Sequence, residues 1–396
     1  MELTFNDEHR LLRNAALDFL KTEVPRERVL EIDESPEGFS PDLWSQMIRL
    51  GWTGMGIPEE FGGSGNSLVE LGVLYEALGE YACPGPLLSA GVLSANVILE
   101  AGDAAQKKSI LGSIAGQGQI VALCYTEPDY GWGAENVSLP ATRRDGGYVL
   151  NGKKLFVPDA HIADRLLIAA RTSAAAAPEQ GVSLFLVDKA SKGVSIRRHN
   201  GWMSDNLCEV DLSNVAVPAS ALVGEAGNAW GAIERARDRA TAVLCTYMGG
   251  GARRVTDMAI EYSKSRVAFG TPIGTFQRVQ DHVIIALNDA DSIKWTAFEA
   301  LWKLDERRPD APLAVSMTKA VASVAFPRAC EESHQVHAGI GSDLNFGLTQ
   351  YTKRARTLQH YLGDTAFHKK RMAKLLKLDQ AEAASLPTQP STGGGR

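Results

Sequence analysis

The chain has 396 residues, of which 44% are hydrophobic and 22% are charged. This composition excludes a largely disordered protein, and the length predicts two or three packed units because single cores stop growing at about 250 to 300 residues. The net charge of −6 argues against a nucleic-acid or anionic membrane surface as partner. The sequence has no run of about 18 apolar residues, and its start lacks the positive charge of a signal peptide, so we expect a cytoplasmic protein without a membrane anchor.

The first part of the chain has the pattern of amphipathic helices. Apolar residues recur at spacings of three and four positions, which places them on one helix face. The clearest set is Leu11, Leu12, Ala15, Ala16, Phe19 and Leu20. Helix breakers, such as the Pro-Gly-Pro at residues 84–86, separate these patterns. We therefore predict a helical N-terminal domain over residues 1–118.

Short β-rich runs begin near residue 120. The runs that predict strands are 120–125, 148–150, 154–157, 166–171, 183–187, 194–197 and 208–217. Asn151 and Gly152 lie between two of these runs and predict a hairpin turn, since a type I′ turn needs two residues that tolerate positive φ. We expect an antiparallel β-barrel or sandwich over residues 119–228, with a surface loop at 172–181.

Helical periodicity returns for the last third of the chain. The apolar positions Val279, Val283, Ala286, Ala290 and Ile293 are one example. We predict a helical C-terminal domain over residues 229–385 that packs against itself and against another subunit. Residues 386–396 have no apolar anchor and should form a disordered tail. The five cysteines lie far apart without metal-ligand spacing, so we expect buried free thiols and no metal site.

Four segments match the motifs of one family in their order and spacing. They are Pro-Glu-Glu-Phe-Gly-Gly-Ser-Gly at 58–65, Thr-Glu-Pro at 126–128, the block from Tyr262 to Gln277, and Gln-Val-His-Ala-Gly-Ile-Gly at 335–341. Together they resemble the acyl-CoA dehydrogenases over nearly the whole chain. The resemblance implies the α+β acyl-CoA dehydrogenase fold, with an N-terminal helical domain, a middle β-barrel or sandwich and a C-terminal four-helix bundle.

The resemblance also implies FAD as cofactor and an acyl-CoA thioester as substrate. In this fold each flavin lies at a dimer interface, where one subunit holds the ring and the base while its neighbour contacts the ADP part. Thr126 would face the flavin from the first subunit. The cofactor-binding residues implied for the second role are Arg266, Phe269, Gln277, Gln335, Gly339 and Gly341. An arginine with a neutral amide offers the donors that a pyrophosphate requires.

The chain departs from the family pattern at the general base. Leu362 stands where the family has the glutamate that removes the proton alpha to the thioester, and the catalytic base is therefore unknown. Asp364 is a weak candidate for a substitute base, although we favour the role of helix N-cap for it. Ala240 occupies the alternative glutamate position of the isovaleryl type. Other lost flavin or substrate contacts fall at Trp132, Phe156, Pro158 and Ala366.

These matches and losses indicate a chain that contributes to a neighbour's flavin site and has lost most of its own. The main hypothesis is a subunit of a heteromeric (α2β2), FAD-dependent acyl-CoA dehydrogenase that desaturates bulky acyl-CoAs, such as those of fatty acid or sterol side-chain catabolism. A homologous catalytic subunit and an electron-transfer flavoprotein or equivalent acceptor would be its partners. The alternatives are a homotetramer that uses Asp364 or an unmatched carboxylate, a related elimination, a flavin monooxygenase, and a flavin-free scaffold.

Overall fold

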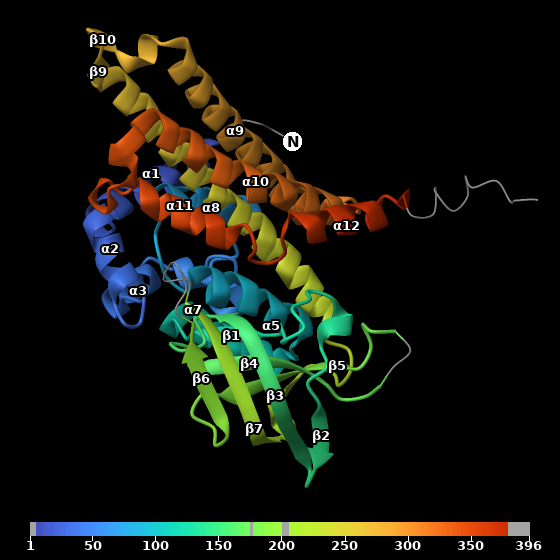
Figure 1. The fold of residues 1–396 in the computed structure, drawn as a ribbon. Coiled ribbons are helices and arrows are strands. Elements are labelled where there is room, and N and C mark those ends of the chain that lie inside the picture. The colour runs from blue at the N-terminus through green and yellow to red at the C-terminus, as the bar shows by residue number, and fades with distance from the viewer. Residues whose placement is uncertain (1–4, 175–176, 200–205, 379–396) are drawn as a thin grey trace, which may run out of the picture.

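The computed structural model describes residues 5–174, 177–199 and 206–378 (Figure 1). Helices come first along the chain, strands follow, and long helices complete it, which confirms the predicted three-part order. In Figure 1 the two sheets lie at one end of the molecule, and the helices of both other parts stack on them. The predicted disordered tail at 386–396 lies outside the described residues.

The N-terminal part consists of short helices around a buried one. Their bounds are α1 Asp7–Glu23, α2 Arg26–Glu34, α3 Pro41–Arg49, α4 Leu68–Glu80, α5 Ala95–Ala101, α6 Ala104–Gln106 and α7 Gly112–Gln117. The buried helix is α4, which starts with a capping box between Ser67 and Glu70. A π-helical segment, Leu87–Ser94, runs directly into α5. Such widened turns are frequent at functional sites.

The middle part contains two four-stranded sheets. The first has the order β1 Val121–Cys124, β4 Arg165–Arg171, β5 Val182–Asp188 and β8 Leu222–Val223. The second has the order β2 Ala141–Arg144, β3 Gly147–Pro158, β7 Leu207–Pro218 and β6 Val194–Arg198. β1 pairs with β4 in parallel, so the prediction of a purely antiparallel unit was wrong. β4 and β5 flank the predicted loop at 172–181.

The predicted hairpin turn at Asn151 and Gly152 was also wrong. Both residues lie inside the continuous strand β3. The register of β3 with β7 shifts at this point, and Asn151 Oδ1 accepts a hydrogen bond from the backbone N–H of Asn214 at 2.6 Å. The tight turn is formed instead by Asp145 and Gly146, which have φ angles of 50° and 77° and join β2 to β3.

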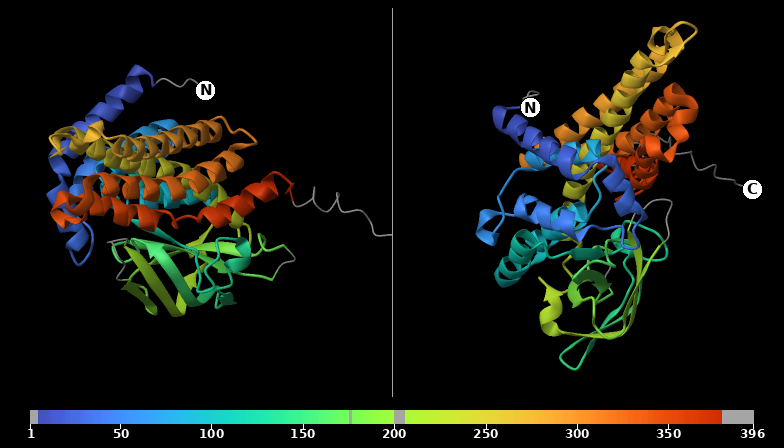
Figure 2. Two further views of the ribbon diagram at one scale, coloured as in Figure 1. Left: turned by 45° about the horizontal axis from the view of Figure 1, so that its top comes forward. Right: turned by 90° about the vertical axis from the view of Figure 1, so that its left-hand side faces the viewer.

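Three long helices dominate the C-terminal part, and the joined ends of two of them project from the body. The long helices are α8 Trp230–Ser265, α9 Gln277–Asp305 and α10 Ala311–His337, and the shorter α11 Leu348–Leu358 and α12 Thr365–Leu375 follow. A short hairpin, β9 Val267–Ala268 and β10 Thr271–Pro272, joins α8 to α9. Figure 2 shows the hairpin at the far end of these helices, away from the sheets. We call residues 262–281 the arm.

α4 and α8 cross in very close contact. A Cβ on Gly79 would lie 2.0 Å from the carbonyl oxygen of Tyr247, and a Cβ on Gly250 would lie 2.0 Å from that of Glu76. Only glycine permits this approach of two backbones. The crossing fixes the helix faces that carry Tyr75 and Tyr247, and both residues line the cavity described below.

All five cysteines are free and buried, which confirms the prediction for the thiols. In the three described ranges, no group of three or more His, Cys, Asp or Glu residues is arranged to hold a metal ion. None of the helices in this described part is both long and apolar enough to cross a lipid bilayer.

Candidate functional site

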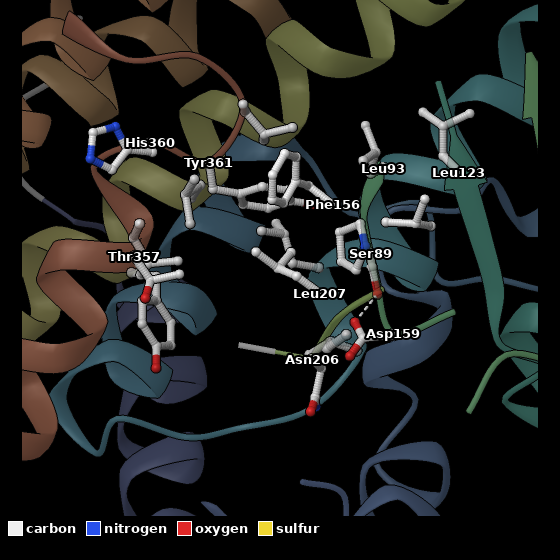
Figure 3. A pocket seen from close by; sticks show the side chains of 18 of the residues that line it. Ser89, Leu93, Leu123, Phe156, Asp159, Asn206, Leu207, Thr357, His360 and Tyr361 are labelled. Atoms are coloured by element: carbon white, nitrogen blue, oxygen red, sulfur yellow. Dashed lines mark hydrogen bonds between the residues drawn. The ribbon is translucent and has the colours of Figure 1, made fainter. Parts of the chain in front are cut away.

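A cavity of about 480 Å³ lies where the three parts of the chain meet (Figure 3). Its walls come from α4, from the segment around the π-helical turn, from β1 and β3, and from the end of α11 with the loop after it. Figure 3 shows Ser89, Asp159 and Asn206 together on one side, with Tyr361 and His360 on the loop that follows α11. Thr126, the residue predicted to face the flavin, also lines this cavity.

A bulge in β3 shapes the cavity wall. Between its pairings with Val210 and Cys208, β3 contains one more residue than β7, and Phe156 takes a φ of 53° at this point. The backbone N–H of Leu155 donates to the carbonyl oxygen of Thr126 at 2.9 Å, which ties the Thr-Glu-Pro turn to the bulge. Bulges re-aim side chains next to functional sites, and here Phe156 becomes part of the lining.

Leu362, which we predict to stand at the position of the family's base, lines the same cavity and is almost fully buried. It has a φ of 60°, an uncommon conformation for a leucine. Its carbonyl oxygen lies 3.2 Å from Nε2 of His368. Burial, together with the nearby charge of Lys319, lowers the pKa of His368 to about 3, so the ring is neutral and Nε2–H can donate to that carbonyl. The loop is therefore held in place by a neutral ring, while the side chain at position 362 itself has no group that could accept a proton.

The other candidate carboxylates near the base position have structural partners. Asp364 is the N-cap of α12, where its Oδ1 accepts from the N–H of Phe367 at 2.8 Å, as we favoured for it. Asp364 does not line the cavity. Asp238, beside the fully buried Ala240, accepts two hydrogen bonds of 2.7 Å from Arg371, which ties α12 to α8.

An aromatic contact at Trp132, where we predict that a substrate contact of the family is lost, joins the middle part to the C-terminal helices. The ring centroids of Trp132 and Phe367 lie 5.4 Å apart, and that of Tyr130 lies 5.0 Å from Trp132 and 5.1 Å from Phe156. The buried Arg237 donates to the carbonyl oxygen of Trp132 and places its guanidinium 5.4 Å from the ring centre of Phe367. We call these five residues the aromatic bridge.

A buried acid lies in the cavity wall. Asp159 is 7% exposed, and its Oδ2 lies 2.5 Å from Oγ of Ser89. Burial raises the pKa of Asp159 to about 6, against the opposing effects of the hydrogen bonds from Ser89 and Asn206 and of the more distant Arg198. A carboxyl group with this pKa is partly protonated near neutrality and can take up or release a proton there.

The raised pKa of Asp159 predicts a pH-dependent stability. The folded state binds the proton more tightly than the unfolded state, so the stabilisation is complete below about pH 4 and is lost as the pH rises through about 6. Relative to the Asp159→Asn variant, the wild type should lose up to about 3 kcal/mol of unfolding free energy between pH 4 and pH 7. Urea unfolding at several pH values measures this difference, and Asp145→Asn, in the exposed turn, is the matched control. A pH-independent difference would contradict it.

The remaining predicted cofactor residues lie outside the cavity. Arg266, Phe269 and Gln277 are exposed on the arm, and Phe269 is 97% exposed. Gln335 and Gly339 are exposed at the end of α10 and in the turn after it. The structure therefore does not bring these residues together with Thr126 within one chain. Their role in binding a cofactor stays a prediction.

The two predicted glycines differ in their surroundings. A Cβ on Gly339 would meet no atom within 4 Å, so packing within this chain does not require glycine there. A Cβ on Gly341 would lie 3.0 Å from Nδ1 of His334 and 3.1 Å from the Cβ of His337, so packing favours glycine at that position. The open surface at Gly339 leaves room for the backbone to be approached from outside the chain.

A buried ion pair fixes the Thr-Glu-Pro turn. Lys154 is 0% exposed, and its Nζ lies 2.7 Å from Oε1 of Glu127. The Glu127 carboxylate also accepts hydrogen bonds from the backbone N–H groups of Ser138 and Leu139 and from the Ser138 hydroxyl. Burial lowers the pKa of Lys154, and the charge of Glu127 opposes this effect. Glu127 thus has a structural task, while Thr126 beside it lines the cavity.

The sequence analysis missed several polar residues of the cavity. Tyr75, Ser89 and Asn206 belong to no motif, and their places in the cavity wall depend on how the chain packs. Asp159 could have been noticed in the sequence. It follows Pro158, at a position where the family that the chain resembles has asparagine. Its burial and its short contact with Ser89, which is distant in sequence, could not be inferred from that exchange.

The helical, β and helical parts, with a cavity at their junction, define an α+β enzyme fold of three units. Three domains of one family match the chain in order. They are the acyl-CoA dehydrogenase N-terminal domain at residues 6–117, the middle domain at 122–215 and the C-terminal domain at 227–377. The chain belongs to the acyl-CoA dehydrogenase family, a family of FAD-dependent flavoenzymes.

Individual relatives are distant but match nearly the full length. The chain is 26% identical over 364 residues to the caffeyl-CoA reductase-Etf complex subunit CarC of Acetobacterium woodii, covering 91% of this chain and 95% of that protein. The FAD complex of PigA has a TM-score of 0.88 at 24% identity and covers 96% of this chain and 100% of its own. The ChsE4-ChsE5 complex from Mycobacterium tuberculosis has a TM-score of 0.85 at 23% identity, with 98% and 100% covered. These two structures share the fold.

Proposed function

We propose that this chain is the base-lacking subunit of a heteromeric FAD-dependent acyl-CoA dehydrogenase, and that it completes the flavin site of a homologous catalytic subunit. The observation that supports this most is the separation of the predicted cofactor residues. Thr126 lines the cavity, while the arm presents Arg266 and Gln277 to the outside. One end of the molecule is thus suited to a neighbour's cofactor, whereas the other has lost its catalytic group at Leu362.

The cavity side of the chain does not fit a flavin ring with a thioester beside it. Pro158 has neither a side-chain hydroxyl nor a backbone N–H to offer to the ring. The contact between Trp132 and Phe367 joins the two walls where the family has substrate contacts. Arg237 lies against this contact and is buried, so opening it would expose aromatic surface and remove a cation–π interaction.

The arm and the end of α10 do fit the ADP part of FAD. Arg266 and Gln277 supply a guanidinium and a side-chain amide, the groups that donate hydrogen bonds to a diphosphate. The exposed Phe269 supplies an aromatic surface that is without cover in the single chain. The chain also offers the open backbone at Gly339. In the assembly these residues would bind and orient the cofactor.

Bound FAD would supply the acceptor for the hydride that leaves the β-carbon of the acyl thioester. Removal of the alpha proton falls to the catalytic subunit, because Leu362 cannot accept a proton. We propose an electron-transfer flavoprotein or equivalent acceptor as the next partner, a cytoplasmic location and a bulky acyl group. The names of two similar proteins support a heteromeric assembly. CarC is named as a subunit of an Etf complex, and ChsE4-ChsE5 is named as a complex.

A second candidate function rests on Asp159. This acid is in the cavity wall, and its pKa of about 6 lies in the range that a general base uses near neutrality. A homomeric dehydrogenase could use it in place of the missing glutamate. The aromatic bridge counts against this alternative, because the proton to be removed must come within hydrogen-bond reach of the base.

The flavin content of the isolated chain tests the main proposal. We expect the chain expressed alone to hold well under one FAD per chain after gel filtration, since its own ring contacts are lost. The absorbance ratio of flavin to protein measures the content. A stable homotetramer with one tightly bound FAD per chain and acyl-CoA turnover would favour the homomeric alternative instead.

Restoring the family's glutamate should not restore activity. The Leu362→Glu variant is expected to oxidise acyl-CoA no faster than Leu362→Gln, which has the same shape and cannot act as a base. The aromatic bridge and Pro158 would still disturb the placement of substrate and flavin. The assay uses flavin-loaded chain and an artificial electron acceptor. A gain of about 10² to 10⁴-fold for the glutamate variant alone would show that only the base was missing.

A further inference from the structure

The cavity contains buried polar atoms that no described residue satisfies. The hydroxyl oxygens of Tyr75 and Tyr361 have no hydrogen-bond partner within the described ranges, and Tyr75 is only 3% exposed. Asn206 Oδ1 likewise has no partner among the described residues, whereas Nδ2 of Asn206 donates to the carbonyl oxygen of Gly38 at 2.9 Å. Because the amide nitrogen of Asn206 makes that bond, the unpaired atom is the amide oxygen, which accepts hydrogen bonds. Buried polar groups in proteins are nearly always paired, so these atoms point to a ligand.

Two groups of polar residues lie in the cavity wall, one around Asp159 and one around Tyr361, and they influence each other electrostatically. Burial raises the pKa of Tyr361, and the nearby acidic groups of Tyr125, Asp159 and Tyr75 raise it further. Figure 3 places Asn206 next to Asp159 and Ser89. The cavity wall therefore offers hydroxyl donors as well as amide and carboxyl acceptors.

The charges around the cavity disfavour an anionic ligand. Arg354 and Arg356 are cations in the lining, but the two terminal nitrogens of Arg354 bind the carboxylate of Asp33 at 3.0 and 3.1 Å, and Arg356 pairs with Glu331. Asp159 adds negative charge when it is ionised. A carboxylate or phosphate would thus enter without a free counter-charge from these groups, which is costly in a buried site. An uncharged ligand avoids this cost.

Most of the remaining lining is apolar, and the size of the cavity suits a small molecule. It includes Leu78, Leu87, Leu88, Leu93, Leu123, Leu155, Leu207 and Leu244. A volume of about 480 Å³ is within the usual range of roughly 300 to 1,000 Å³ for ligand sites. A hydroxyl group accepts a hydrogen bond from a tyrosine and also donates one to an amide oxygen, so a single group can serve both kinds of atom.

We propose that this cavity binds a free, uncharged small molecule with an apolar body and one hydroxyl group. The ligand would be free rather than a CoA thioester, because Trp132 and Phe367 are in contact at the position of the family's substrate contacts. The inference goes beyond the proposed function, since it assigns a ligand to the part of the chain that the proposed assembly does not use for catalysis.

Calorimetric titration of the full chain with 4-cyclohexylcyclohexanol tests this inference. We expect one site per chain, and a roughly three- to ten-fold lower affinity for the methyl ether of the same alcohol, which cannot donate a hydrogen bond. Tyr75→Phe should weaken binding of the alcohol by a similar factor, as should Tyr361→Phe if the first variant folds poorly. Tyr81→Phe, just after α4 and outside the lining, is the matched control and should leave the affinity unchanged.

Two results would overturn the inference. Absence of binding, with a higher Tm for Tyr75→Phe than for Tyr81→Phe, would mean that the buried hydroxyl is only a structural cost. Displacement of the alcohol by decanoyl-CoA at comparable affinity would make the cavity a thioester site. Neither result depends on the flavin content of the chain, so this inference and the proposed function can fail separately.

Discussion

Replacing Glu127 with alanine is expected to lower the free energy of unfolding by about 3 to 5 kcal/mol, because it leaves the ammonium group of Lys154 buried without its anion. The backbone N–H groups of Ser138 and Leu139 would lose their acceptor as well. Urea unfolding followed by circular dichroism measures the loss. It would be among the largest effects of a single substitution outside the apolar core.

Two comparisons separate the unpaired charge from other effects. The double variant Glu127→Gln with Lys154→Met should recover much of the stability, because it removes both charges and keeps an acceptor for the two N–H groups. Glu135→Ala, at an exposed position on the same loop, should change the stability by no more than about 0.5 kcal/mol. A loss for Glu127→Ala as small as that for Glu135→Ala would show that water or another group satisfies Lys154.

Arg266→Ala is expected to weaken flavin binding by the whole assembly roughly ten- to a hundred-fold, although Arg266 is distant from the cavity of its own chain. The loss of a charge-assisted contact to a phosphate costs about 1.5 to 3 kcal/mol. The affinity is measured by flavin release from the complex that is isolated through a tag on this chain. Arg253→Ala is the control, because Arg253 is a half-exposed arginine of α8 that pairs with Asp257. Equal flavin affinity in both variants would contradict a role of the arm in binding a neighbour's cofactor.

The sequence allowed the order of the three parts and most strands to be predicted, because periodicity and breakers are local signals. The misplaced hairpin shows the limit of such signals. Asn151-Gly152 and Asp145-Gly146 are both suited to a tight turn, and the choice depends on β7, which is long enough to pair on both sides of Asn151. A parallel pair such as β1 and β4 joins segments about 40 residues apart and leaves no local pattern.

The candidate site was predictable where a motif carries it and not where packing creates it. The prediction that a base is missing at Leu362 rests on one exchanged residue. The aromatic bridge could not be predicted, although Trp132 was named as the position of a lost contact, because the contact of Trp132 with Phe367 depends on how α12 docks on α8. The acid at Asp159 became significant only through its burial and its contact with Ser89.

The projecting arm has a consequence for how such an enzyme would behave on dilution. When contacts to one cofactor are divided between two chains, subunit association and flavin uptake follow one linked equilibrium. Free flavin would then stabilise the assembly, and lowering the protein concentration would release flavin and subunits together. In a cell, the relative rates of synthesis of the two chains would set the fraction of active enzyme. Any excess of this subunit would be colourless, because it would hold no flavin.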